Sequence, residues 1–408
     1  DVYKRQVLRN NYLQTQTISM MEKLTGARLG AKQHFISVLE SEGILDRDLE
    51  KLPHDEELTR RRGIGLGMSR PELSVLLSYS KIMLYGQLLD SDIPEDPWLS
   101  QELLRYFPKP LQEKYSDYMH GHRLKREIIA TQVTNSLVNR MGASFALRMH
   151  EDTGAGAAEV ARAFTIAREI FNARDFWSKI EALDNKAGSE SQVNAILSMW
   201  NLLRQTTRWV LNQSRDKLDI RASVERLTPG MEILGKKISQ SLNEVEKARV
   251  LEQADPMIDD GVPRNLAIQA STLHLLYPAL DVVETAARRN DDVLMVATVF
   301  FDLGERLGLK WLRESVEKLP VAGQWHAHAR GSLRDELYSQ HRRLAGQVLE
   351  AFPKVKDPVK SWAESNNEAV EHVSFMLRDM QGLPSMDYAT VSVAVRSLES
   401  LLKESSTK

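Results

Sequence analysis

Hydrophobic residues recur every three or four positions along most of the chain, which is the period of an amphipathic helix. The clearest instance is the stretch "GMSRPELSVLLSYSKIMLYGQLL". Here Ser69 occupies the expected N-cap, Pro71 falls in the first turn and Glu72 completes a Ser-x-x-Glu capping box. The pattern predicts a helix over residues 71–89, which ends at "DSDIPEDP".

A second apolar ridge follows His122 and repeats every four residues. It consists of Ile129, Val133, Leu137, Met141, Phe145 and Met149. Because a helix has 3.6 residues per turn, such a ridge winds slowly around the axis and meets different neighbours at its two ends. We predict one long central helix here, and we interpret Gly142 as a point of close approach between helices and not as a helix end.

The same periodicity predicts the remaining helices, while alternating β-branched runs are almost absent. The predicted helices cover residues 157–171, 191–213, 223–253, 263–289, 291–307, 311–319, 324–351, 359–380 and 385–402. The chain shows no repeat of fixed length, which argues against a regular solenoid. The predicted fold class is all-α, an irregular multi-helix assembly in which the loop-like stretches "LDNKAGSESQ" and "DPMIDDGVPRN" suggest two helical subdomains.

Charge and composition narrow the classes of partner. The 408 residues include 54 Lys and Arg against 56 Asp and Glu, for a net charge of −2, so no basic field attracts nucleic acid or anionic lipid. The absence of Cys excludes thiol catalysis and Cys-ligated metals. Apolar runs are shorter than the roughly 20 residues that a transmembrane helix needs. We expect a cytoplasmic protein with no nucleic-acid or membrane partner.

Two short motifs resemble binding sites and have simpler interpretations. Gly63, Gly65 and Gly67 could suggest a phosphate-binding loop, but "KLPHDEELTRRR" before them is no strand and Met68 stands where a dinucleotide motif needs its third Gly. A flexible connection between helices is the favoured interpretation. The triplet Arg60–Arg62 could dock an acidic surface, but a solvated face balanced by "HDEE" upstream is favoured.

Pairs of histidines and carboxylates are the next candidates. His120 with His122, and His326 with His328, lie two residues apart and so point in nearly opposite directions on a helix, which disfavours chelation of one metal ion. The pairs 259–260 and 291–292 are Asp pairs that we place at helix starts, where carboxylates favour the helix dipole. No metal site is predicted.

Tryptophans are scattered one or two to a helix, which indicates core packing and not a stacking platform. They are Trp98, Trp177, Trp200, Trp209, Trp311, Trp325 and Trp362. The residues alone therefore reveal no catalytic constellation.

Several long phrases resemble the C-terminal helical region of the large bacterial NAD-specific glutamate dehydrogenases. They include "LRNNYLQTQ", "YFPKPLQEKY", "HRLKREIIATQVTNSLVNRMGASF", "VARAFTIAREIF", "FFDLGERLGLKWLRESVEKLP" and "ARGSLRDELYSQHRRL". The resemblance implies oxidation of L-glutamate with NAD to 2-oxoglutarate, ammonia and NADH by the full-length enzyme. It also implies that the catalytic residues and the NAD site lie in other parts of the polypeptide, so no catalytic, cofactor-binding or metal residue is assigned here.

The resemblance also sets the expected domains and partners. We expect linker helices over 7–62, helical subdomains over 63–187 and 188–408, contact with upstream catalytic domains of the same polypeptide, and a homo-oligomer. Arg9–Gln16 would join the nucleotide-binding domain to this region, and its Asn10, Asn11 and Gln14 could approach the active-site cleft, although a structural role at the seam is favoured. An autonomous helical scaffold for partner proteins is the alternative function.

The first residues do not fit the rest. "DVYKRQ" lies outside the resemblance, and no N-cap precedes the helical pattern that begins near Val7. The hexapeptide back-translates to GATGTGTATAAGAGACAG, which looks like a transposase adapter from a sequencing library. We expect residues 1–6 to be a library artefact, with the true helix start upstream.

Overall fold

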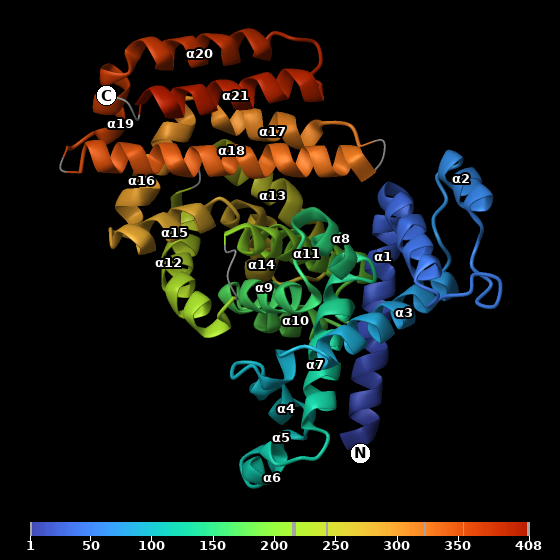
Figure 1. The fold of residues 1–408 in the computed structure, drawn as a ribbon. Coiled ribbons are helices and arrows are strands. Elements are labelled where there is room, and N and C mark those ends of the chain that lie inside the picture. The colour runs from blue at the N-terminus through green and yellow to red at the C-terminus, as the bar shows by residue number, and fades with distance from the viewer. Residues whose placement is uncertain (1, 214–217, 242–243, 322–323, 354, 406–408) are drawn as a thin grey trace. The chain divides into compact units, whose positions relative to one another are not determined.

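The structure is a computed structural model that describes residues 2–213, 218–241, 244–321, 324–353 and 355–405. Every regular element among them is a helix, and these residues contain no strand (Figure 1). The predicted all-α class is confirmed. By their contacts the helices form two compact units, residues 1–225 with 242–274, and residues 226–241 with 275–408.

The first unit contains the amino-terminal helices and a later pair. Its elements are α1 (Val2–Ser41), α2 (Asp55–Gly63), α3 (Arg70–Leu89), η1 (Ile93–Glu95), α4 (Ser100–Tyr106), α5 (Lys109–Gln112), α6 (Ser116–His120), α7 (Lys125–Met141), α8 (Phe145–Thr153), α9 (Ala157–Ile170), α10 (Ala173–Glu181), α11 (Ser189–Gln213), α13 (Glu244–Asp259) and α14 (Arg264–Thr272). The predicted helix at 71–89 is thus confirmed as α3, and the Ser69 amide donates to Glu72 Oε2 at 2.6 Å as a capping box requires.

The first unit packs around α9. The sequence "AAEVARAFTIAREI" is small and apolar enough to be buried on every side, and its main contacts are with α11, with further contacts to α3, α7, α8 and α10. Arg162 and Arg168 are buried with it, at 1% and 2% exposure. A buried guanidinium is stable only when acidic groups pair with it. The segments that carry these acidic groups must therefore lie against α9.

The predicted long helix over the second apolar ridge is wrong at its centre. The chain forms α7 and α8, separated by Gly142, whose φ of +86° and ψ of 172° are not helical. A Cβ added at Gly142 would meet Met21 Cγ at an ordinary 3.7 Å, so close packing does not require glycine here. The backbone conformation does, because side chains with a Cβ rarely adopt this φ.

We predict that Gly142→Ala lowers the free energy of unfolding by about 1 to 3 kcal/mol, the cost of forcing a Cβ into this conformation. Gly86→Ala is the matched control, because Gly86 lies inside α3 with no atom within 4 Å of an added Cβ. That variant should gain about 0.5 to 1 kcal/mol from helix propensity. Urea unfolding of both variants measures the difference, and equal effects would refute the backbone explanation.

The second unit contains the carboxyl-terminal helices and most of α12. Its elements are α12 (Ile220–Ser241, of which residues 226–241 belong here), η2 (Leu273–Leu276, with its last two residues), α15 (Ala279–Arg289), α16 (Val293–Arg306), α17 (Leu309–Lys318), α18 (Gln324–Ala351), α19 (Pro358–Ser365), α20 (Asn367–Gln381) and α21 (Tyr388–Ser405). Within it α18 contacts α15, α16, α17, α19 and α21, so this 28-residue helix organises the unit.

Two helices predicted as continuous are broken. The predicted helix 223–253 is covered by α12 and α13, and its continuity at 242–243 lies outside the described residues. The stretch 263–289 divides at Pro278, which has no amide hydrogen and disfavours helical geometry at the residue before it. The stretch 359–380 breaks at Asn366, whose side-chain amide donates to the Trp362 carbonyl at 2.8 Å and so competes with the helical backbone.

The contact-based units do not coincide with the subdomain limits predicted at residue 187. The reason is that α11 packs with α9 and also with α13 and α14, which pack with each other. The limits 7–62, 63–187 and 188–408 therefore stay predictions about independently folding parts.

A buried histidine holds α16, α17 and α18 together in the second unit. His341 is 1% exposed and stacks on the Phe300 ring at 3.6 Å. Its Nε2 donates to the Phe300 carbonyl at 2.8 Å, and its Nδ1 accepts from Arg313 at 3.2 Å. Burial, reinforced by repulsion from Arg313, lowers its pKa from 6.5 to about 3. The folded protein thus keeps this imidazole neutral.

Acidification should therefore destabilise the second unit. Below pH 6.5 the unfolded chain protonates His341 while the folded chain does not, so the free energy of unfolding falls as pH falls. Between pH 7 and pH 5 the loss should be about 2 kcal/mol. His341→Gln should remove this part of the pH dependence in urea unfolding, whereas His54→Gln, at an exposed histidine, should keep it. Identical pH profiles for both variants would contradict this account.

Candidate functional site

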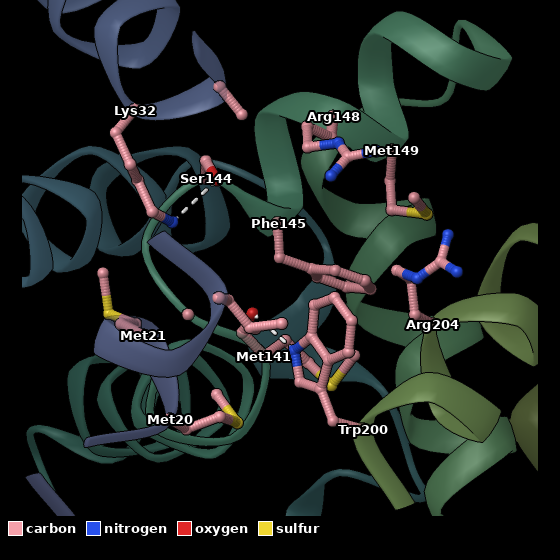
Figure 2. Close-up of a pocket in the computed structure, with 13 residues that line it drawn as sticks. Met20, Met21, Lys32, Met141, Ser144, Phe145, Arg148, Met149, Trp200 and Arg204 are labelled. Carbon is pink, nitrogen blue, oxygen red and sulfur yellow. Dashed lines mark hydrogen bonds between the residues drawn. The ribbon is translucent and has the colours of Figure 1, made fainter. Parts of the chain in front are cut away.

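The candidate site is a small cavity in the first unit, between α1, α7, α8 and α11 (Figure 2). Its volume is about 20 Å³. This is room for about one water molecule, and an ordinary ligand pocket is more than ten times larger. The cavity is therefore not a site for a whole substrate or a nucleotide.

Most of the cavity wall is apolar. The apolar side chains are Met20, Met21, Leu24, Ala31, Met141, Phe145, Met149 and Trp200. Trp200 of α11 is fixed by its indole nitrogen, which donates to the Met141 carbonyl at 2.9 Å. That bond uses a carbonyl in the last turn of α7, which α7 itself leaves without a helical partner. The prediction that Trp200 is a core residue is thus confirmed.

The polar part of the wall is cationic. Lys32 of α1 is 7% exposed and donates from Nζ to Ser144 Oγ at 3.2 Å. Figure 2 shows Lys32 directed toward Ser144, which precedes α8, with Arg148 from the next turn of α8. Arg204 of α11 lies over the Trp200 ring, with its guanidinium carbon 5.5 Å from the ring centroid. The lining residues therefore include three cations and no acid.

A second cluster of charges lies where α4, α9 and α10 meet. Glu102 is 3% exposed and accepts hydrogen bonds from Arg105 at 2.9 Å, from Arg168 at 3.1 Å and from Arg174. Burial opposes ionisation of Glu102, but the three arginines outweigh it and lower its pKa. Burial and repulsion by Arg168 lower the pKa of Arg174 to about 10. The ion pairs of Glu102 with these arginines thus connect α4, α9 and α10.

We predict that Glu102→Gln destabilises the protein by about 3 to 5 kcal/mol, because it leaves buried guanidinium groups without their shared carboxylate. Glu113→Gln, at an exposed position, is the control and should change the unfolding free energy by less than about 0.5 kcal/mol. Thermal unfolding followed by circular dichroism measures both. A Glu102→Gln protein as stable as the control would show that the cluster contributes nothing to folding.

The glycine-rich motif connects two helices, which confirms the interpretation favoured from the sequence. Gly63 ends α2, Gly65 has a φ of +71°, and α3 begins three residues after Gly67. Arg61 holds this connection in place, since it donates to Glu57 of α2 and to Glu72 of α3 at 2.8 to 3.1 Å. Its neighbours in the triplet are also engaged within the chain, with Arg60 on Glu57 and Arg62 on Gln33.

None of the four histidines in the two His-x-His pairs is among the residues that line the cavity. His120 Nδ1 contacts the Ser116 carbonyl at 2.9 Å, His122 packs against Phe107, and His326 stacks on Tyr388 at 5.1 Å between ring centroids. Within the described ranges, no three His, Asp or Glu side chains are grouped so that they could hold a metal ion.

The aspartate pairs divide into one correct and one wrong prediction. Asp292 caps α16, since its Oδ1 accepts from the amides of Leu294 and Met295 at 3.0 and 2.9 Å. The pair 259–260 is not at the start of its own helix, because Asp259 ends α13. Instead the Asp260 carboxylate lies against Gly188, directly before α11, where an added Cβ would be 2.1 Å from its Oδ2. The chain uses this carboxylate at another helix's N-terminus.

The tryptophans are core residues with one clear exception. Those buried to 6% exposure or less are Trp177, Trp200, Trp209 and Trp362. Trp98 and Trp311 are partly exposed. Trp325 is 83% exposed at the start of α18, which the scatter of tryptophans along the sequence did not predict.

The predicted seam Arg9–Gln16 lies in α1. The side chains of Asn10 and Asn11 are outside the described part of the chain, and that of Gln14 is exposed. Tyr12 ties this part of α1 to α11, since its hydroxyl donates to Gln192 Oε1 at 2.9 Å and accepts from Gln16 at 2.6 Å. The pKa of Tyr12 is raised to about 12, mainly because burial disfavours the charged form of its hydroxyl.

Comparison with known proteins identifies the chain. The family model described as "Glutamate dehydrogenase, C-terminal" matches residues 65–400. The chain belongs to this family. The glutamate dehydrogenase C-terminal match covers α3 to most of α21. It therefore includes the first unit without α1 and α2, nearly all of the second unit, and most of the residues that line the cavity.

The relatives give the same result over almost the whole chain. NAD-specific glutamate dehydrogenases of Halomonas elongata and Pseudomonas aeruginosa are each 38% identical over 98% of it, and that of Mycobacterium tuberculosis is 30% identical over 91%. The chain spans about a quarter of the length of these relatives, 25%, 25% and 23% respectively. The predicted membership of this family is confirmed.

Sequence reasoning missed the cations of the cavity. Lys32, Arg148 and Arg204 stand in three separate helical stretches with no common motif or spacing. Met141, Phe145 and Met149 were singled out only as a packing ridge, and Trp200 only as a core anchor. No signal along the sequence connects these positions, so only the packing of α1, α8 and α11 reveals them.

Proposed function

We propose that this chain is the noncatalytic C-terminal part of an NAD-dependent glutamate dehydrogenase. The match of residues 65–400 to the C-terminal family model carries the proposal. The full-length enzyme would convert L-glutamate, NAD and water to 2-oxoglutarate, ammonia and NADH. The relatives named above are NAD-specific glutamate dehydrogenases, which supports this reaction.

The NAD site and the catalytic groups would belong to other parts of the polypeptide. Oxidation of glutamate needs a proton-accepting side chain and a glycine-rich loop after a strand for the pyrophosphate. The glycine-rich stretch of this chain joins two helices, and the cavity holds about one water molecule. Both observations support a role outside the chemistry.

The role we propose is mechanical. Helices tied by buried ion pairs, such as α4, α9 and α10 through Glu102, form a stiff body. Such a body can support catalytic domains of the same polypeptide and limit their closure without supplying a chemical group.

We further propose that the enzyme is a homo-oligomer in the cytoplasm. No single helix of the described residues is long and apolar enough to cross a membrane, and only the consecutive pair Arg264–Leu276 and Ala279–Arg289 reaches that composition jointly.

The test is an activity assay. The purified 408-residue chain, incubated with L-glutamate and NAD, should form no NADH above the rate without protein, because it would lack the reacting groups. The full-length enzyme from the same gene, assayed in parallel, should form NADH and provides the positive control. NADH formation proportional to the concentration of the isolated chain would overturn the assignment.

A further inference from the structure

We propose that residues 106–124 of the first unit form the surface against which the preceding part of the full-length polypeptide docks. We call the exposed apolar side chains of this segment the tyrosine surface. They are Tyr106, Leu111, Tyr115, Tyr118 and Leu124. The inference rests on the proposed function, because it takes this chain to be the C-terminal part of a longer enzyme. It adds the place where the two parts of that enzyme meet.

Exposed large apolar side chains are concentrated in this segment. Five of the nineteen such side chains in the described part of the chain fall within residues 106–124, which are less than a twentieth of the 408 residues. Tyr118 is 80% exposed, and the other four are 38% to 54% exposed. Single exposed apolar residues are normal on a protein surface, whereas a concentration of them marks a site of interaction.

The tyrosine surface also has the composition of an interface. The rings of Tyr115 and Tyr118 lie 6.3 Å apart between centroids. The Tyr115 amide donates to the Leu111 carbonyl at 3.0 Å, so these two residues are one helical turn apart and lie on one face. Tyrosine combines a large apolar ring with a hydroxyl that can form a hydrogen bond, and it is enriched where proteins associate.

The segment has little apolar core of its own. Helix α5 has four residues, none of them buried, and α6 has five residues, of which only Met119 is buried. Their main helix contacts are with α4 and with each other. Helices as short as these are not stable by themselves. A partner that covers the tyrosine surface would supply the apolar contacts that the segment lacks.

The tyrosine surface lies at the same end of the first unit as the amino end of α1. The Thr17 hydroxyl donates to the Asn139 carbonyl, and a Cβ added at Gly142 would lie 3.7 Å from Met21 Cγ, so α1 and α7 run in the same direction. The amino ends of both helices are each about 20 Å back from the first of these contacts. Because α6 leads directly into α7, the polypeptide before α1 arrives beside α5 and α6 (Figure 1).

The preceding part of the enzyme is large enough to cover this surface. The chain spans about a quarter of the length of its relatives and matches a C-terminal family model, which leaves about three quarters of such an enzyme to other parts. A domain joined directly to α1 is held beside the tyrosine surface at high effective concentration. An interface of about 20 residues on each side is then sufficient for stable docking.

The charges of the segment predict the charge of the docked face. Exposed basic residues outnumber exposed acidic ones here: Lys109, Lys114, Arg123 and Lys125 stand against Glu113 and Asp117. The Lys114 ammonium lies 5.2 Å from the centroid of the Tyr115 ring, so charge and aromatic surface adjoin. Complementary charges favour one orientation of two docked surfaces. We therefore expect an apolar face surrounded by carboxylates on the preceding part of the polypeptide.

Amide hydrogen exchange in the full-length enzyme and in the 408-residue chain tests the proposal directly. The amides of residues 106–124 should exchange at least about tenfold more slowly in the full-length enzyme, because docking would suppress local opening of the short helices. Helix α9 is the internal control, since it is buried within the first unit and should exchange alike in both proteins. Equal exchange of residues 106–124 in both proteins would overturn the proposal.

Two substitutions of Tyr118 in the full-length enzyme test whether its ring makes the contact. Tyr118→Asp removes the ring and adds a carboxylate opposite the expected acidic face, so exchange of residues 106–124 should return to the rate of the 408-residue chain. Tyr118→Phe is the matched control, since it keeps the ring and should keep the protection. Neither change should alter the unfolding of the 408-residue chain, because Tyr118 is 80% exposed. Protection that survives Tyr118→Asp would contradict the proposal.

A photo-reactive benzoylphenylalanine in place of Tyr118 identifies the occupant. Irradiation of the full-length enzyme should join it to a peptide that precedes this chain, in a product with the mass of one polypeptide. A product with the mass of two polypeptides would identify a second copy as the occupant. That result, or a cross-link only to peptides within the 408 residues, would overturn the proposal.

The NADH assay described above decides the proposed function separately. A full-length enzyme that forms NADH while residues 106–124 exchange as fast as in the isolated chain would refute the docking and retain the proposed function. NADH formation by the isolated chain would refute the proposed function, whereas the cross-link from position 118 would still decide what covers the tyrosine surface.

Discussion

The first unit depends on the burial of two arginines in α9. Arg162 and Arg168 are enclosed because α9 is covered by helices around its whole circumference. Arg162 pairs with Asp92 at 2.6 Å and Asp96 at 3.2 Å, and Arg168 pairs with Glu102 and Glu169. The segment around η1 and the helix α4 must therefore lie against α9, because a guanidinium without a carboxylate cannot stay in the interior.

The second unit follows the same rule around α15. Asp281 and Glu284 are 2% and 1% exposed and lie among the apolar residues of that helix. Arg342 of α18 pairs with Asp281 at 2.8 Å, and Arg226 of α12 holds both oxygens of Glu284. A Cβ added at Gly230 would be 2.7 Å from Val283, which explains why α12 carries glycine where it crosses α15. Each unit is thus specified by ion pairs as well as by apolar packing.

These charges serve the structure of this member of the glutamate dehydrogenase C-terminal family. Among the described residues, the buried acids Glu102, Asp281 and Glu284 all have arginine partners. Balanced pairs of this kind are typical of places that hold helices together. The small cavity of the first unit differs from them in its wall, which consists mostly of methionine and other apolar side chains.

The sequence by itself determined the helical class, the family and the elements with strong local signals. The α3 cap, the extent of α18 and the capping by Asp292 follow from local spacing, since a helix is made of contacts between residues at most four apart. It could not determine where α7 ends, because Gly142 suits either a close approach or a positive φ. Nor could it assign Asp260 to the start of α11, or bring Lys32, Arg148 and Arg204 to one cavity. Those facts depend on contacts between residues far apart in the chain, which only tertiary packing decides.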